Sequence, residues 1–178
     1  FPPAFSEFME IVLKMILDKC SKEDLDTKIT EFYASLKKIP YAEIARNTSV
    51  QNIEKYMKGK TSGLLVHDSG TPAHVKAAIT YNKFLKLKGI DHLYEPIRSG
   101  EKIKYVFLKQ NEYGIPTIAF KGYRDPKDVT DLIEQYIDYD DLFESELKNK
   151  LEDFYRVLGW SKIPTDVNQH ATDFFSFT

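Results

Sequence analysis

The stretch TPAHVKAAITYNKFLKLKG, residues 71–89, contains four lysines, one histidine, one tyrosine and one asparagine, but no aspartate or glutamate. Thr71 is a suitable N-cap, Pro72 suits the first helical position, and Gly89 suits the position just after a helix. The stretch is therefore predicted to form one helix. Four apolar residues recur at helical spacing and are predicted to face the core: Val75, Ala78, Ile79 and Leu85.

The polar residues of this helix are predicted to flank the apolar stripe. His74, Tyr81 and Lys88 are seven residues apart and nearly align on a helix, and Lys76 and Lys83 align on another edge. Lysines supply positive charge, while histidine, tyrosine and asparagine supply oriented donors, so the array suits a phosphate backbone. A lysine-rich face that contacts only solvent is the alternative interpretation.

The basic residues are concentrated in one part of the chain. The net charge of the 178 residues is only −2, but residues 1–130 hold 21 Lys and Arg against 16 Asp and Glu, whereas residues 131–178 hold 4 against 11. Residues 44–88 hold eight basic residues and two acidic ones. A basic region beside an acidic one indicates that a polyanion binds one face, with a solvated charged surface as the alternative.

The rest of the sequence predicts a mostly helical α+β fold. Helices are expected from Ser6 to Cys20 and from Ser21 to a stop at Pro40, which gives a helical hairpin over residues 1–40. Tyr41–Ala45 is expected to be a short strand, and Ser49 is expected to cap a helix over residues 50–57. The runs GEKIKYVFL and IPTIAF predict two strands within a small antiparallel β unit, residues 90–124. Helices are expected again over 131–137 and 142–158, with five residues facing inward: Leu147, Leu151, Phe154, Val157 and Leu158.

No catalytic or metal site is predicted in this chain. GKTS at residues 59–62 lacks the earlier glycine of a phosphate-binding P-loop, because position 54 is Glu54. The acidic run at residues 138–141 is interpreted as a solvated connection between helices. The single Cys20 excludes an intrachain disulfide and weakly favours the cytoplasm. No apolar run approaches the roughly 18–20 residues that span a bilayer, so no membrane partner is expected.

The last residues, DFFSFT, are unusually aromatic for a chain end. Phe174, Phe175 and Phe177 either pack into the core of this chain or dock into a pocket of another protein. The breaker-rich segment that begins near residue 161 favours docking through a tether.

Taken together, these segments resemble the thumb, the C-terminal portion, of a family B DNA polymerase of the tailed-phage type. The most specific parts are SVQNIEKY at residues 49–56 and HVKAAITYN at residues 74–82. The similarity also covers IPTIAF and the long segment VTDLIEQYIDYDDLFESELKNKLEDFYRVLGW. The aromatic tail resembles the peptide with which such polymerases bind their sliding clamp.

The resemblance implies a thumb module over residues 1–160, with DNA-contacting helices in 41–89 and helices in 125–160, followed by a linker and clamp-binding peptide over 161–178. It implies that one group of residues contacts the backbone of primer–template duplex: Ser49, Asn52, Lys55, Tyr56, His74, Lys76, Tyr81 and Asn82. Lys102 and Lys104 are expected as additional contacts, and the three tail phenylalanines as clamp contacts. For a phage protein, the compartment would be the host cytoplasm.

The sequence departs from that family in lacking the metal-binding aspartates of the palm and the acids of the exonuclease. This chain is therefore expected to be inactive alone and to carry no cofactor, with Mg²⁺ bound by the missing palm. It would be either a fragment or the small subunit of a polymerase made in two pieces, whose partner supplies palm, fingers and exonuclease. The alternatives are a stand-alone nucleic-acid-binding accessory protein, or a scaffold whose helical hairpin joins proteins.

Overall fold

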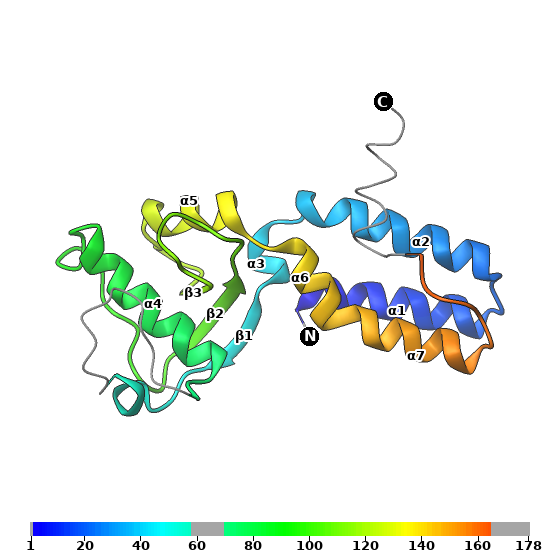
Figure 1. The fold of residues 1–178 in the computed structure, drawn as a ribbon, viewed down its shortest axis with the longest axis horizontal. Helices are drawn as coiled ribbons and strands as arrows, with labels where there is room; N and C mark the ends of the chain where they lie inside the picture. The colour runs from blue at the N-terminus through cyan, green and yellow to red at the C-terminus, as the bar shows by residue number, and fades with distance from the viewer. Residues whose placement is uncertain (1, 58–69, 165–178) are drawn as a thin grey trace. The chain divides into compact units, whose positions relative to one another are not determined.

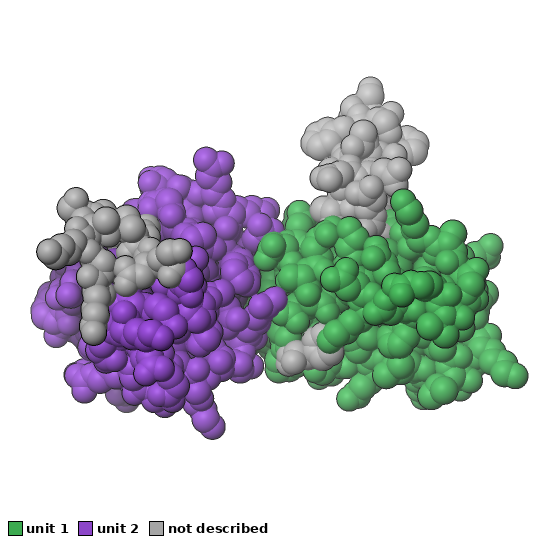
Figure 2. All heavy atoms as spheres, turned by 60° about the horizontal axis from the view of Figure 1, so that its bottom comes forward, with its two compact units in different colours: residues 1–44, 139–178 green, residues 45–138 purple. Residues whose placement is uncertain are grey.

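The computed structural model describes residues 2–57 and 70–164 and divides the chain into two compact units (Figure 1). The first, here called the helical unit, contains the chain up to Ile44 and again from Tyr139. The second, here called the sheet unit, contains Ala45–Asp138 and is inserted in sequence between the two parts of the first (Figure 2). The fold is α+β and mostly helical, as predicted. Every helix in the described ranges is too short or too polar to cross a bilayer.

The helical unit begins with two helices that pack against each other. Its elements are α1 (Pro3–Leu17), α2 (Lys22–Ser35), the 3₁₀ turn η1 (Leu36–Lys38), α3 (Tyr41–Ile44), α6 (Tyr139–Phe143), the π-helical segment η3 (Glu144–Lys148) and α7 (Asn149–Val157). Ser21 caps α2 by accepting a hydrogen bond from the backbone N–H of Asp24 (3.1 Å). Phe8 stacks on Phe32 with ring centroids 4.0 Å apart, which joins α1 to α2.

Polar contacts between distant parts of the sequence also hold the helical unit together. The Tyr155 hydroxyl of α7 donates a 2.5 Å hydrogen bond to Asp26 of α2, and Lys22 pairs with the same carboxylate at 2.6 Å. The Tyr33 hydroxyl donates to Asp140. Burial raises the pKa of the Tyr155 hydroxyl well above the usual tyrosine value, and its hydrogen bond to Asp26 raises it further.

Raising the pH above about 10 is expected to lower the stability of the helical unit through Tyr155. The folded state keeps the Tyr155 proton at a pH where the unfolded chain has released it, so the unfolded state binds fewer protons. Its contribution is fully present below about pH 10 and is lost as the pH rises through the higher folded pKa. Urea unfolding at about pH 9 and about pH 11 tests this, with Tyr155→Phe as the control that should lose part of the pH dependence. An unchanged pH dependence in that variant would contradict it.

The sheet unit is built on a three-stranded antiparallel sheet. Its elements are β1 (Arg46–Ser49), the 3₁₀ turn η2 (Ile53–Tyr56), α4 (Ala73–Leu87), β2 (Lys102–Phe107), β3 (Thr117–Phe120) and α5 (Lys127–Tyr136). The strand order is β1-β2-β3, and α4 packs against β3 and β2. The apolar stripe predicted on α4 is confirmed, because all four of its residues are buried. Gly89 follows the helix with a φ of +67°, as the sequence indicated.

Several predicted boundaries are wrong in this region. Tyr41–Ile44 is helical rather than extended, because Pro40 suits a first helical turn and its carbonyl accepts from the Glu43 N–H (2.9 Å). The first strand is Arg46–Ser49, so Ser49 ends a strand and does not cap a helix. Because this strand pairs with β2, the β unit is not confined to residues 90–124. In the helical unit, α1 begins at Pro3 and not at the predicted Ser6, because proline is tolerated in a first helical turn.

The last helices differ from the predicted 142–158 helix in the direction of their apolar side chains. Leu147 and Leu151 are buried as predicted, but Val157 is 85% exposed and Leu158 is exposed as well. In α7 the buried side chains are four residues apart, and Val157, two residues beyond the second of them, therefore lies on the opposite side of the helix. Tyr155 takes the buried position instead.

Candidate nucleic-acid interface

Two of the predicted DNA contacts, Lys102 and Lys104, project from one face of β2. Residues two apart on a strand share a face, and antiparallel pairing places Lys102 opposite Ser49 and Lys104 opposite Asn47. The side chains of these four residues therefore form one polar area across β1 and β2. This area is hollowed into a cavity of about 360 Å³, here called the sheet pocket, which is lined by Asn47, Thr48, Ser49, Lys102, Ile103, Lys104 and Lys121.

The sheet pocket is positively charged. Three of its lining residues are lysines, and no carboxylate lines it. Ser49 adds an exposed hydroxyl and Asn47 an exposed amide from the neighbouring strand. Lysine ammonium groups beside neutral hydrogen-bond donors are the groups that proteins use to contact phosphate oxygens.

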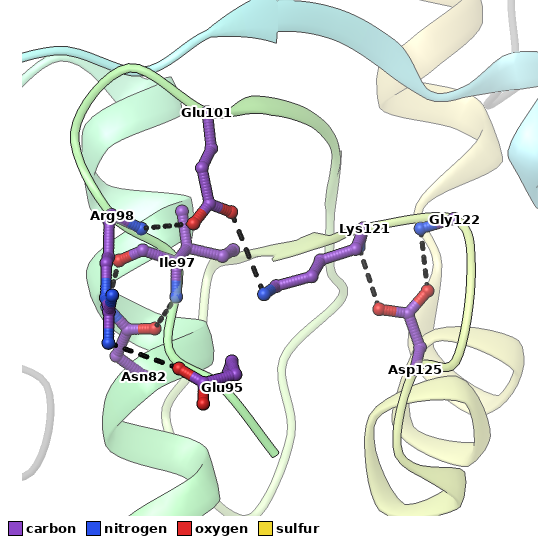
Figure 3. Close-up of polar contacts among 8 residues, drawn as sticks. All are labelled: Asn82, Glu95, Ile97, Arg98, Glu101, Lys121, Gly122 and Asp125. Carbon is purple, nitrogen blue, oxygen red and sulfur yellow. Dashed lines mark hydrogen bonds and ion pairs between the residues drawn. The ribbon is translucent and has the colours of Figure 1, made fainter.

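The loop after β3 positions the third lysine of the sheet pocket (Figure 3). The Asp125 carboxylate accepts hydrogen bonds from the backbone N–H groups of Lys121 (2.8 Å) and Gly122 (2.7 Å). Gly122 has a φ of +89°, and a side chain there would touch the stem of Lys104 at 3.6 Å. A glycine at this position therefore allows the loop to turn beside Lys104.

A second hollow, of about 410 Å³, shares Lys102 and Lys121 with the sheet pocket. It is lined by Glu95, Arg98, Glu101, Lys102, Lys121 and Tyr123. Unlike the sheet pocket, it contains carboxylates: Glu101 pairs with the Lys121 ammonium at 3.7 Å, and Glu95 pairs with Arg98 at 3.2 Å. Lys121 therefore lines both a cavity without carboxylates and a cavity with two of them.

Asn82, expected to contact DNA, instead holds a loop of the sheet unit. Its side-chain amide donates to the Ile97 carbonyl (2.9 Å) and accepts from the Ile97 N–H (2.7 Å), as Figure 3 shows. Ile97 is buried, so these two bonds satisfy backbone groups that have little access to water. The Asn82 amide is engaged within the protein.

Tyr81 is also a core residue rather than a surface one. Only 1% of the residue is exposed, and burial raises the pKa of its hydroxyl well above the usual range. The expectation that Tyr81 contacts the duplex backbone therefore does not fit the structure. The helical spacing that aligned Tyr81 with His74 was correct, but the buried face of α4 is wider than the sequence indicated.

The remaining predicted contacts lie on α4 and η2, which pack against each other. His74 and Lys76 are half-buried in the first turns of α4. Lys55 is exposed, and its ammonium lies 5.2 Å from the ring centroid of the half-buried Tyr56. Asn52 is exposed and has left-handed backbone geometry (φ +57°) at the start of η2. None of these five residues lines the sheet pocket.

Some predicted features lie outside the described residues. The three phenylalanines expected to bind a clamp, Phe174, Phe175 and Phe177, are among them. Within residues 2–57 and 70–164, no group of three or more His, Cys, Asp or Glu side chains is arranged to hold a metal ion.

Lys121 is the main site residue that sequence reasoning missed. It directly follows the strand IPTIAF, whose register places Phe120 opposite Lys104. One sequence signal could have identified Lys121: it ends a predicted strand, and the other predicted strand carries alternating lysines. Asn47 was missed because RNTS has neither the apolar alternation nor the composition of a typical strand.

Comparison with known proteins adds no family assignment. No protein-family model matches the chain, and a search of curated proteins finds no significant match. The residues of the sheet unit, together with the resemblance seen in the sequence, are therefore the basis for proposing a function.

Proposed function

We propose that this chain is the duplex-gripping thumb part of a family B replicative DNA polymerase. In this proposal it holds primer–template DNA through the phosphate backbone, while nucleotidyl transfer and its Mg²⁺ belong to the palm of the same polymerase, on this chain's continuation or on a separate one. The sliding clamp would dock on the C-terminal tail. The observation that carries the proposal is the sheet pocket, where three lysines and the polar residues of β1 surround a cavity with no carboxylate in its lining.

The chemistry of the sheet pocket favours backbone contacts over base reading. Lysine offers a mobile point charge without the fixed planar fork of arginine, which suits contacts to phosphates at varying positions along a strand. Such backbone contacts carry little sequence information, which suits a protein that must move along any template. Each neutralised phosphate releases counterions, so binding should weaken steeply as salt rises.

Replacing Lys102 and Lys104 together with glutamine is expected to weaken duplex binding by on the order of tenfold or more at about 0.1 M salt. The slope of log affinity against log salt should become smaller by roughly two, because two phosphate contacts are lost. Fluorescence anisotropy with a labelled primer–template duplex, repeated over a range of salt, measures both quantities.

The matched control is Lys37→Gln with Lys38→Gln, which removes two exposed lysines from the helical unit. This control should bind duplex like the unmodified chain. An equal loss in both double variants would show that only total charge matters. A loss that differs between two duplex sequences would contradict the assignment of these lysines to phosphates.

A further inference from the structure

One carboxylate competes for the lysine that completes the sheet pocket. The Lys121 side chain is only 13% exposed, and it lines both the sheet pocket and the second hollow. The Lys121 ammonium forms an ion pair with Glu101 at 3.7 Å, and the Glu101 side chain is 35% exposed. Glu101, which lines the second hollow, also accepts a hydrogen bond from the backbone N–H of Arg98 (3.3 Å), as Figure 3 shows.

The ion pair between Lys121 and Glu101 is weak enough for another anion to take the place of Glu101. Its separation of 3.7 Å is near the limit of direct contact, and the Glu101 carboxylate remains accessible to water. Partly exposed pairs of this kind contribute little, because water and salt screen them. A phosphate group in the sheet pocket would meet three lysines at once, and its several oxygens could accept from the lysines and from Ser49.

We infer that the sheet pocket seats one phosphate group, and that this phosphate displaces Glu101 from Lys121. The inference rests on the proposed function only for the source of the phosphate, which would be a nucleic-acid strand. A free phosphate compound offers the same chemistry. Glu101 is thus an internal competitor that limits how tightly the cavity holds a phosphate, so that a bound strand can be released.

The inference predicts that Glu101→Gln tightens duplex binding by about two- to fivefold at about 0.1 M salt, the range expected for the loss of one partly exposed ion pair. The glutamine oxygen can still accept from the Arg98 N–H, so the loop keeps its hydrogen bond. The matched control is Glu95→Gln, which removes a charge from the second hollow but not from a partner of Lys121. Glu95 and its partner Arg98 are largely exposed, and neither lines the sheet pocket.

A double-mutant cycle assigns the effect to Lys121. In the Lys121→Gln background, the additional change Glu101→Gln should no longer tighten binding, because the competed lysine is absent. Lys121→Arg, which keeps the charge and the long stem, serves as a second background in case Lys121→Gln unfolds, and there the gain should persist. Equal effects of Glu101→Gln and Glu95→Gln, or a gain that survives in Lys121→Gln, would overturn the inference.

A titration of the full chain with sodium pyrophosphate separates this inference from the proposed function. Amide resonances of Thr48, Ser49, Lys102 and Lys121 should shift on titration, and Glu101→Gln should again bind more tightly than Glu95→Gln. If pyrophosphate gives this result but no variant binds duplex, the phosphate seat stands and the proposed function fails. If duplex binds with a strong salt dependence but Glu101→Gln has no specific effect, the proposed function stands and this inference fails. If neither pyrophosphate nor duplex binds, both this inference and the proposed function are wrong.

Discussion

Replacing Tyr81 with alanine is expected to lower the free energy of unfolding of the sheet unit by about 3–5 kcal/mol, the range for truncating a buried aromatic side chain. Tyr81 lies in the middle of α4, where only 1% of the residue is exposed, and α4 packs against β2 and β3. The alanine variant would leave a cavity at this packed position, and cavities of this kind are filled only partly by relaxation of the neighbours.

Hydrogen exchange of the α4 amides is the suitable measurement, because the single tryptophan, Trp160, belongs to the helical unit and would not report on the sheet unit. The control is Tyr81→Phe, which keeps the ring and removes only the hydroxyl. No hydrogen bond joins that hydroxyl to a residue in the described ranges, so the cost should stay below about 1 kcal/mol. If the Tyr81→Ala variant were as stable as the Tyr81→Phe variant, the Tyr81 ring would not be part of the core.

Replacing Asn82 with alanine is expected to cost about 2–4 kcal/mol, because the change removes two hydrogen bonds and leaves the buried N–H and C=O of Ile97 without their partner. The stability of Asn82→Asp should fall between that of the alanine variant and that of the unmodified chain. A carboxylate can accept from the Ile97 N–H but cannot donate to its carbonyl. Lys86→Ala, an exposed position on the same helix, is the matched control and should have little effect.

The same variant also separates a structural role from a DNA-binding one. Under conditions where Asn82→Ala remains folded, its salt slope for duplex binding should match that of the unmodified chain, because asparagine neutralises no phosphate charge. A folded variant with normal stability and greatly reduced duplex affinity would contradict the structural role and restore the expectation from the sequence.

The helix of residues 71–89 was predictable because its signals are local. A proline at its start, a glycine after its end and apolar residues at helical spacing all depend on nearby residues, and the observed helix, Ala73–Leu87, agrees within two residues at each end. The width of its buried face was not predictable, because that depends on which strands the helix covers. Tyr81 and Asn82 are both polar enough to be exposed, and only the tertiary structure gives each an internal position.

The sheet pocket shows the same division between local and distant causes. The alternation of Lys102 and Lys104 on a strand was visible in the sequence, and both lysines line the cavity. The residues across from them come from β1, more than fifty positions earlier, and RNTS becomes a strand because β2 supplies its backbone partners. Lys121 joins them through the Asp125 loop, a contact that no residue spacing in β2 reveals.

The insertion of the sheet unit between Ile44 and Tyr139 has a consequence for the order of folding. The bonds from Tyr33 to Asp140 and from Asp26 to Tyr155 join residues more than a hundred positions apart, so the helical unit cannot be completed until the intervening chain brings these ends together. A sheet unit that has already collapsed closes most of that distance, and closing a short gap costs less entropy than closing a long one. During synthesis, Ala45–Asp138 is also finished before α7 is made, so α1 and α2 are complete well before the helix whose Tyr155 bonds to α2.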